Sequence, residues 1–217
     1  EPNLNYKKVE NNIVEDVCAK SVTIYRDVQQ PLVTVAFKIP GAKEKIDFVV
    51  DALCWVLASG KSSRLYKKLV QELQLVTDIE AFSYDLFEKG LLFLSFYPNE
   101  ASKIDEILKI IGAELEGLAK NGPTEKEIIR ASKQVEMEQL SMLEDCQKQA
   151  YSIGQFYLAN GDENYIFNYF DQDNLAAKAQ ELCAKYLRPN LMNVGKVLPM
   201  SEDDKKHWVE VQKISDA

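Results

Sequence analysis

Histidine is nearly absent from this chain. His207 is the single histidine among 217 residues, and it lies close to the C-terminus. A zinc site or an acid–base mechanism that needs two imidazoles is therefore excluded within the chain. The segment His207-Trp208-Val209-Glu210-Val211 follows four positions of an H-x-x-E-H zinc motif, but valine stands at the fifth position. We therefore predict a solvated tail there, with no metal ligands and no catalytic residues in the chain.

Cysteine is also scarce, and its spacing does not suggest a metal site. The four cysteines are Cys18, Cys54, Cys146 and Cys183, and no two of them form a C-x-x-C pair. Cys54 and Cys183 fall in apolar helical patterns, so we expect buried thiols at both positions. An even number of cysteines leaves disulfide formation open.

Long apolar runs and positive charge are lacking too. No apolar run approaches the roughly 20 residues of a membrane helix, so we expect no membrane partner. The net charge is −8, which repels phosphate backbones and argues against a nucleic-acid partner. Few cysteines and no N-glycosylation sequon are compatible with a bacterial periplasm or cytoplasm and do not decide between them. The chain begins with Glu1 and has no signal segment, so we expect it to be a piece of a longer protein.

Hydrophobic periodicity indicates both strands and helices. Alternating apolar residues predict strands at 21–27, 31–40, 76–86, 91–97 and 191–198. Apolar residues three and four positions apart predict helices at 46–57, 104–121, from 124 onward, at 147–159, 164–170 and 175–187. Another helix is expected after Gly60, with Ser62 or Ser63 as N-cap and Leu65, Leu69 and Leu73 on its apolar side.

The order of these elements is typical of an α+β fold. Hairpins with helices grouped between them predict a largely antiparallel sheet with helices packed on one face. We expect one domain over residues 1–199 and a charged tail or linker over 200–217. Thr124 and Glu127 match a capping box for the helix that follows them.

Two motifs suggest chemistry that their context does not support. Ser59-Gly60-Lys61-Ser62 resembles the end of a phosphate-binding loop, but Trp55 stands where that loop needs its first glycine. Asp78 and Glu80 would share one face of a strand, where paired carboxylates can do acid–base work. With 34 acidic residues in the chain, a chance pair is the better explanation. Serine and cysteine nucleophiles lack a nearby base.

Three segments together resemble the pitrilysin/insulinase type of zinc metallopeptidase, specifically its C-terminal, non-catalytic domain. The most specific is Gly60-Lys61-Ser62-Ser63-Arg64-Leu65-Tyr66-Lys67-Lys68-Leu69. The others are the opening Glu1-Pro2 with Gln30–Pro40, and Gly122–Glu127 followed by Tyr186–Leu191. The resemblance spans residues 1–199. It implies the mitochondrial-processing-peptidase-like metallohydrolase fold.

The resemblance also carries functional expectations. It implies a wall domain that encloses peptide substrates beside a partner domain, in the same or a second chain, which bears H-x-x-E-H and the zinc. This chain itself would hold no cofactor. The family places a substrate-holding Arg and Tyr at the positions of Val70 and Thr77, whose side chains cannot replace them, so the substrate-binding residues stay unknown. Arg64 is interpreted as structural. The alternative is a structural or assembly scaffold of the same fold without peptidase activity in the full-length protein.

Overall fold

The computed structural model describes residues 19–85, 88–161 and 173–201. The five strands of its sheet are β1 (Ser21–Arg26), β2 (Leu32–Pro40), β3 (Val76–Asp85), β4 (Lys89–Pro98) and β5 (Asn193–Pro199). The main helices are α1 (Asp47–Leu57), α2 (Ile104–Asn121), α3 (Glu125–Leu143), α4 (Cys146–Asn160) and α6 (Leu175–Tyr186). Shorter turns are η1 (Ala42–Glu44), the π-helix η2 (Tyr66–Glu72), η3 (Ala101–Lys103) and η4 (Pro189–Leu191).

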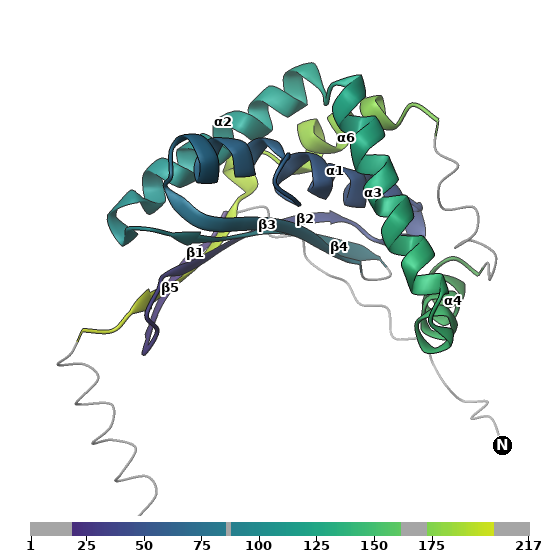
Figure 1. Ribbon diagram of the computed structural model, residues 1–217, viewed down its shortest axis with the longest axis horizontal. Coiled ribbons are helices and arrows are strands. Elements are labelled where there is room, and N and C mark those ends of the chain that lie inside the picture. Colours follow the sequence, from purple (N-terminus) through teal and green to yellow (C-terminus); the bar gives the residue numbers. More distant parts are fainter. Residues whose placement is uncertain (1–18, 86–87, 162–172, 202–217) are drawn as a thin grey trace, which may run out of the picture.

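The strands form one sheet in the order β1-β5-β2-β4-β3. Only the β1–β5 pair is parallel, and the three other pairs are antiparallel. The helices α1, α2, α3 and α6 cover one face of this sheet (Figure 1). The predicted α+β class, with a largely antiparallel sheet and helices on one face, is therefore confirmed.

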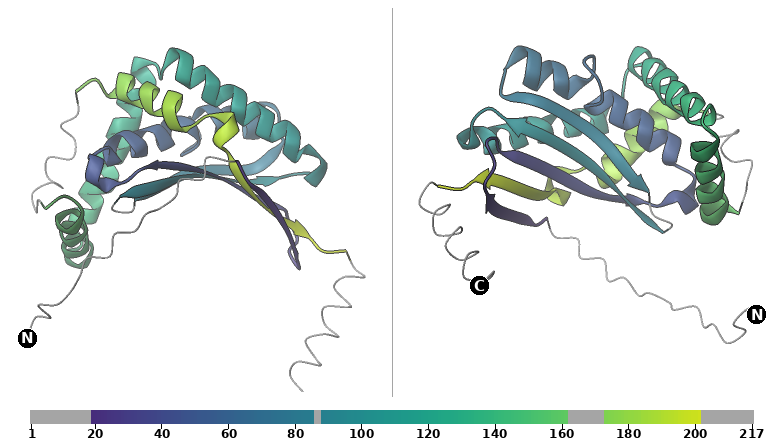
Figure 2. Two further views of the ribbon diagram at one scale, coloured as in Figure 1. Left: turned by 180° about the vertical axis from the view of Figure 1, so that it is seen from behind. Right: turned by 60° about the horizontal axis from the view of Figure 1, so that its bottom comes forward.

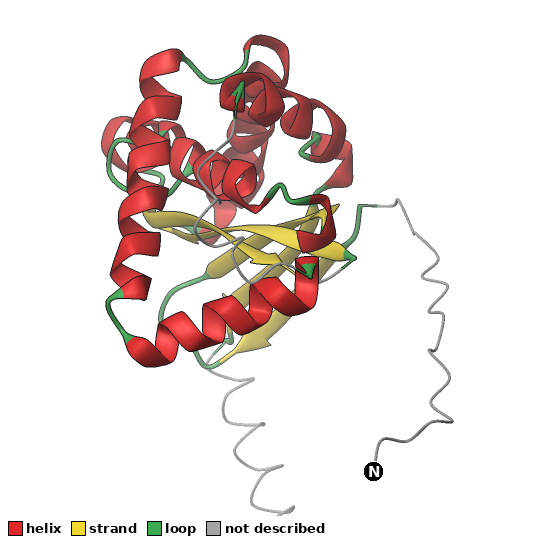
Figure 3. Cartoon of the chain, turned by 90° about the vertical axis from the view of Figure 1, so that its right-hand side faces the viewer, coloured by secondary structure: helices red, strands yellow, loops and turns green. Residues whose placement is uncertain are grey.

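One helix departs from that layer. In both views of Figure 2, α4 lies beyond one end of the sheet, on the side away from the other helices. Seen from that end, α4 runs crosswise below the helix layer (Figure 3). Its burial is correspondingly slight, because Ser152 is its one buried residue among those whose burial is described. Among the described residues, no helix is layered on the opposite surface of the sheet.

The core lies between the sheet and the helix layer. Alternate residues of β2 point into it and are at most 1% exposed: Val33, Val35, Phe37 and Ile39. The apolar stripe of α2 packs from above, with Ile107, Ile111, Leu115 and Leu118 fully buried. The buried residues of β2 recur at every second position and those of α2 at every third or fourth position, as the sequence predicts for a strand and a helix that pack together.

The helix after Gly60 differs from its prediction in two ways. Neither Ser62 nor Ser63 is the N-cap of η2, which is Leu65 without a side-chain cap bond; the Ser63 hydroxyl is buried and donates to the Gly60 carbonyl at 2.7 Å. Most of the helix is the π-helix η2, which ends at Glu72, so Leu73 stands at the C-cap and is 47% exposed. The other elements agree with their predicted ranges to within a few residues. The helix predicted at 164–170 and most of the tail lie outside the described residues.

The thiols follow the prediction where they are described. Cys54 and Cys183 are buried, and burial raises the pKa of the Cys183 thiol to about 12. Such a thiol stays protonated and is a packing group rather than a nucleophile. Cys146 is exposed at the start of α4, and Cys18 lies outside the described residues.

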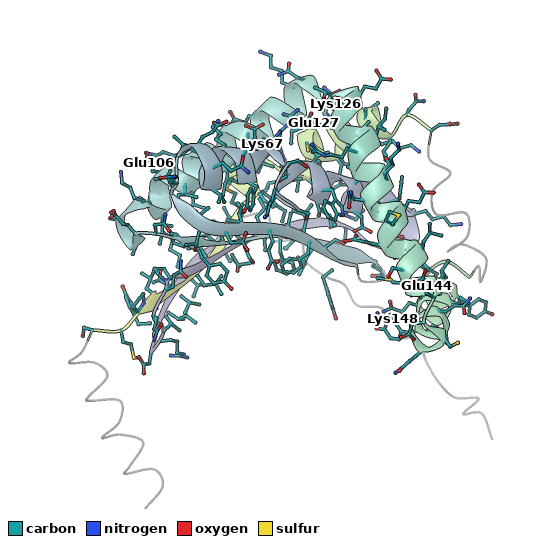
Figure 4. The ribbon with its side chains drawn as sticks, viewed as in Figure 1. Lys67, Glu106, Lys126, Glu127, Glu144 and Lys148 are labelled. Atoms are coloured by element: carbon teal, nitrogen blue, oxygen red, sulfur yellow. The ribbon has the colours of Figure 1, made fainter. Side chains whose placement is uncertain are left out.

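Arg64 joins three parts of the helix layer. Its guanidinium donates to both carboxylate oxygens of Glu127 at 2.7 and 2.8 Å and to Glu114 of α2 at 3.1 Å. Glu127 also accepts the Thr124 backbone N–H, which completes the predicted capping box of α3. Figure 4 shows Glu127 near the upper end of α3, on the helix side of the sheet. These contacts support the interpretation of Arg64 as a structural residue.

Candidate functional site

The described residues hold no group of three or more His, Cys, Asp or Glu side chains that could bind a metal ion. His207 lies outside them. None of the described helices is long and apolar enough to cross a membrane.

The two positions that the family resemblance singled out lie beside the first part of β3. Val70 is half-buried in η2 and packs against the core. Thr77 is exposed in β3, where its hydroxyl accepts from the Gln30 side chain at 2.6 Å and donates to the Tyr97 carbonyl at 3.2 Å. Neither side chain carries a charge, so neither can form the ion pair with a peptide that an arginine at this position would form.

The surface of the sheet opposite the helices, here called the open face, is the largest candidate. Strand register and alternation place these residues on it: Val22, Ile24, Arg26, Leu32, Thr34, Ala36, Lys38, Asp78, Glu80, Phe82, Tyr84, Lys89, Leu91, Phe93, Ser95, Tyr97, Asn193, Gly195 and Val197. Side chains project from this side of the strands in Figure 4. Most of these residues are apolar, although a sheet face turned to water normally carries polar side chains.

Aromatic residues concentrate where β3 pairs with β4. Phe82 lies opposite Phe93, and the two rings stack with their centroids 5.1 Å apart and an angle of 23° between their planes. Tyr84 lies opposite Leu91, the next pair on the same face of these two strands. Phe82 is 44% exposed and Tyr84 is 60% exposed. We call Phe82, Tyr84, Leu91 and Phe93 the aromatic patch.

Charged and polar groups border the aromatic patch on both sides, and on one of them Lys38 lies opposite Leu91 while Lys89 precedes Leu91 by two residues on the same face. Towards the start of β3, Glu80 and Asp78 follow Phe82 at every second residue on the same face. Both are exposed, and one Asp78 oxygen accepts the Ile79 backbone N–H at 2.9 Å. Next to them, the Thr34 and Ser95 hydroxyls lie 3.0 Å apart across β2 and β4. The open face thus changes from aromatic to acidic along β3.

A second apolar surface lies on α3 and α4. The four residues that we call the α4 surface are all strongly exposed: Met137 64%, Leu140 48%, Tyr151 66% and Leu158 80%. Figure 4 labels Glu144 and Lys148 at the turn between these helices, away from the sheet centre. Several large, strongly exposed apolar side chains on one pair of helices are typical of a contact surface for another protein part.

Sequence reasoning found the Asp78–Glu80 pair and the strands but not the aromatic patch. Alternation places Phe82 with Tyr84 and Leu91 with Phe93, yet it does not tell which strand face the helices cover. The available signal was the two-residue spacing of Phe82 and Tyr84 in one strand and of Leu91 and Phe93 in the next. Whether these residues are buried or exposed depends on which face of the sheet the helices cover.

Comparison with known proteins gives these surfaces a context. A family model described as the peptidase M16 inactive domain matches residues 3–135. The chain is also similar to the zinc protease PqqE of Helicobacter pylori, with 29% identity over 111 residues. That match covers 51% of this chain and 25% of the relative, so the chain spans much less than the full relative.

Solved structures agree on the fold. A protease from Helicobacter pylori superposes with a TM-score of 0.76 at 23% identity, covering 91% of this chain and 49% of that one. The inactive peptidase domain of a putative zinc protease from Bordetella parapertussis superposes with a TM-score of 0.71 at 24% identity, covering 82% of this chain and 96% of that one. The first structure is therefore about twice as long as this chain, and the second is about one such domain.

Proposed function

The chain belongs to the family of peptidase M16 inactive domains, and from this premise we propose that it forms a chamber wall beside a zinc-bearing peptidase domain. The wall would enclose peptides or short unfolded chains while the partner domain, in the same or a second chain, cleaves them. Bacterial zinc proteases among the relatives support this reading. The observation that carries it is the open face, a largely apolar sheet surface that none of the described helices covers.

The chemistry divides between the two parts. Zinc in the partner would activate a water molecule for attack on a peptide bond. The residues of this chain would contribute enclosure, which limits the size of the substrate and excludes bulk water from the reaction space. An apolar wall suits that task because an unfolded peptide exposes apolar side chains that a folded protein buries.

The remainder of a longer relative offers the partner. This chain covers 49% of the Helicobacter pylori protease structure, which leaves room there for a second part of similar length. The α4 surface would meet that part, because it is apolar and projects beyond the sheet. The open face would then be closed off from one end.

The test compares the chain with and without its partner. The chain of residues 1–217 with added zinc should not cleave a quenched fluorescent peptide, whereas a protein that also contains the H-x-x-E-H domain should cleave it. Peptidase activity of this chain alone would refute the division of roles. If the partner domain has no zinc ligands, the alternative of a scaffold without peptidase activity is correct.

A further inference from the structure

The sheet has two edge strands, and they differ in how well they are protected against pairing with a foreign strand. The edges are β1 and β3, because the strand order is β1-β5-β2-β4-β3. β3 carries the charged Asp78 and Glu80, and its register shifts between Val76 and Asp78. Charged side chains and an irregular register keep an edge from adding a strand. β1 has neither between Ser21 and Tyr25, where its pairing with β5 is regular.

The side chains of β1 are also uncovered on both faces of the sheet. All six residues of β1 are exposed, including Val22 at 61%, Ile24 at 42% and Tyr25 at 55%. In Figure 1 and in the left view of Figure 2, the β1–β5 pair curves away from the helix layer, so the described helices leave this edge accessible. A segment rich in β-branched and aromatic residues, which favour strands, is thus exposed at an open edge.

Backbone bonds to β5 use every second residue of β1. The Lys20 carbonyl accepts from the Val194 N–H at 2.7 Å, and the Arg26 carbonyl accepts from the Met200 N–H at 2.9 Å. In a regular parallel pair, the residues that bond the neighbouring strand alternate with residues that do not. The even-numbered residues of β1 therefore bond β5, and the odd-numbered ones point their N–H and C=O groups to the free edge.

The odd-numbered residues are Ser21, Thr23 and Tyr25. Within the described part of the chain, only the Tyr25 carbonyl among these outward backbone groups has a partner, the exposed Arg26 guanidinium at 3.1 Å. That carbonyl keeps a second lone pair. The edge of β1 therefore presents three residues in succession, each with one backbone donor and one backbone acceptor.

We propose that β1 is a self-association edge, at which a second copy of this chain pairs its own β1 antiparallel about a two-fold axis through Thr23. In this register Thr23 lies opposite Thr23 of the second copy, and Ser21 lies opposite its Tyr25. Each of these three residues donates one backbone hydrogen bond to the other copy and accepts one. The two sheets join into one, with both open faces on the same side. This inference does not depend on the proposed function.

The side chains of β1 fit this symmetric register. Val22 lies opposite Ile24 of the second copy on the open face, and Ile24 lies opposite its Val22. Both side chains are apolar and exposed, so pairing removes apolar surface from water. At each end Lys20 lies opposite Arg26, with Asp27 beside them, and their repulsion costs little because all three are exposed to solvent. An edge that matches its own reversed copy fits a second chain better than an unrelated strand.

A single strand pair buries a small area, which sets the expected affinity. Interfaces of less than about 1,200 Å² are weak, so we expect a monomer–dimer equilibrium with a Kd on the order of 10–100 µM. Each copy has one β1, so association stops at the dimer. Sedimentation velocity of the 217-residue chain over about 1–500 µM measures this equilibrium.

Proline at the centre of the edge tests the backbone bonds. Thr23→Pro removes an N–H that points away from β5, so the sheet of the single chain keeps its bonds and the melting temperature should fall only slightly. The dimer should weaken by at least about tenfold, because both copies lose a central hydrogen bond. Thr23→Val keeps the backbone N–H and is the matched control, which should change the Kd by less than about twofold.

Charged side chains test the register. Val22→Glu and Ile24→Lys should each weaken the dimer by about threefold to tenfold, because each places a charge opposite an apolar side chain. The double variant should recover most of the affinity, since each new carboxylate then lies opposite a new ammonium of the other copy. Leu158→Asp, on the α4 surface, should leave the Kd unchanged.

Hydrogen exchange locates the interface independently of these variants. Above the Kd, the amides of Ser21, Thr23 and Tyr25 should gain protection relative to dilute protein, whereas those of Val22 and Ile24, which bond β5 in either state, should change little. Equal changes in the odd-numbered and even-numbered amides would contradict the proposed edge.

Three further outcomes would overturn the proposal. They are a chain that stays monomeric throughout the concentration range, a folded Thr23→Pro variant that dimerises like the parent, and a dimer that Leu158→Asp abolishes. If Thr23→Pro does not fold, the single variants at Val22 and Ile24 and the recovery in the double variant decide the question.

Discussion

At the scale of single residues, the Glu127 carboxylate takes part in both an ion pair and a helix cap. It pairs with Arg64 and closes the capping box with Thr124 at the start of α3. The bond from Arg64 is the main reason that the pKa of Glu127 falls to about 2, and bonds from Thr124 lower it further. The ionised form is thus the one that holds η2, α2 and α3 together.

Glu127→Gln should destabilise the fold by about 1–3 kcal/mol at pH 7, because it removes a charge-assisted pair and weakens a cap. Urea unfolding measures this value. Glu125→Gln is the matched control, since Glu125 lies in the same first turn and is exposed. It should cost only a few tenths of a kcal/mol.

The pH dependence of this difference has a definite sign. Glu127 titrates near pH 2 in the folded state and near pH 4.3 when unfolded, so its contribution is complete above about pH 5. It is lost as the pH falls from about 4.5 to 2. The difference in the free energy of unfolding between the parent and Glu127→Gln should therefore become smaller between pH 5 and pH 3. A difference that does not change with pH would contradict the role assigned to Glu127.

At the scale of elements, the turn between α1 and η2 explains a misleading motif. Gly60 has a φ of +82°, and a β-carbon there would lie 2.8 Å from a Trp55 ring atom. Trp55 is itself held by a bond from its indole N–H to Glu138 of α3 at 3.2 Å. The Ser59–Ser62 segment is therefore a turn packed under a fixed ring and not a cradle for phosphate.

Gly60→Ala should lower stability by at least about 1 kcal/mol, because alanine disfavours this φ and collides with Trp55. Gly117→Ala is the control, since Gly117 lies inside α2 with nothing within 4 Å of an added β-carbon. That change should raise stability by about 0.5–1 kcal/mol through helix propensity. Melting temperatures of both variants test the pair, and a shift of the same sign in both would refute the explanation.

At the scale of the whole molecule, the fold presents two apolar surfaces with different shapes. The open face is a broad sheet surface, and the α4 surface projects past its end (Figure 2). Their separation is consistent with the proposed role, in which one surface would enclose substrate and the other would contact a neighbouring domain.

If the proposed zinc-bearing domain contacts the α4 surface, Leu158→Asp should weaken their association by about tenfold or more, because it places an unpaired charge in an apolar interface. Its effect on the melting temperature should be small, since Leu158 is 80% exposed. Val22→Asp, at the opposite end of the sheet, is the control and should leave association unchanged. Calorimetric titration of the two domains measures both, and equal losses would argue against the α4 surface.

Much of the fold could be predicted because local patterns coincide with tertiary ones. Alternation in β2 and the apolar stripe of α2 place the same residues inward that the structure buries. Thr124 and Glu127 lie three residues apart, so their capping box depends on local geometry alone. The prediction of Ser63 as an N-cap was wrong because its hydroxyl donates to the Gly60 carbonyl and does not accept from a backbone N–H of the helix. Serine side chains form local bonds of both kinds with similar strength.

The sequence alone determined that this chain holds no two-histidine zinc site, that strands and helices alternate as they do, and that it resembles an inactive peptidase domain. These are matters of residue type, order and spacing. Only the tertiary structure decided that the Phe82 side of β3 faces away from the helices, and that α4 leaves their layer. A strand's alternation defines two faces but not which one is covered, because that depends on apolar area buried between elements distant in the chain.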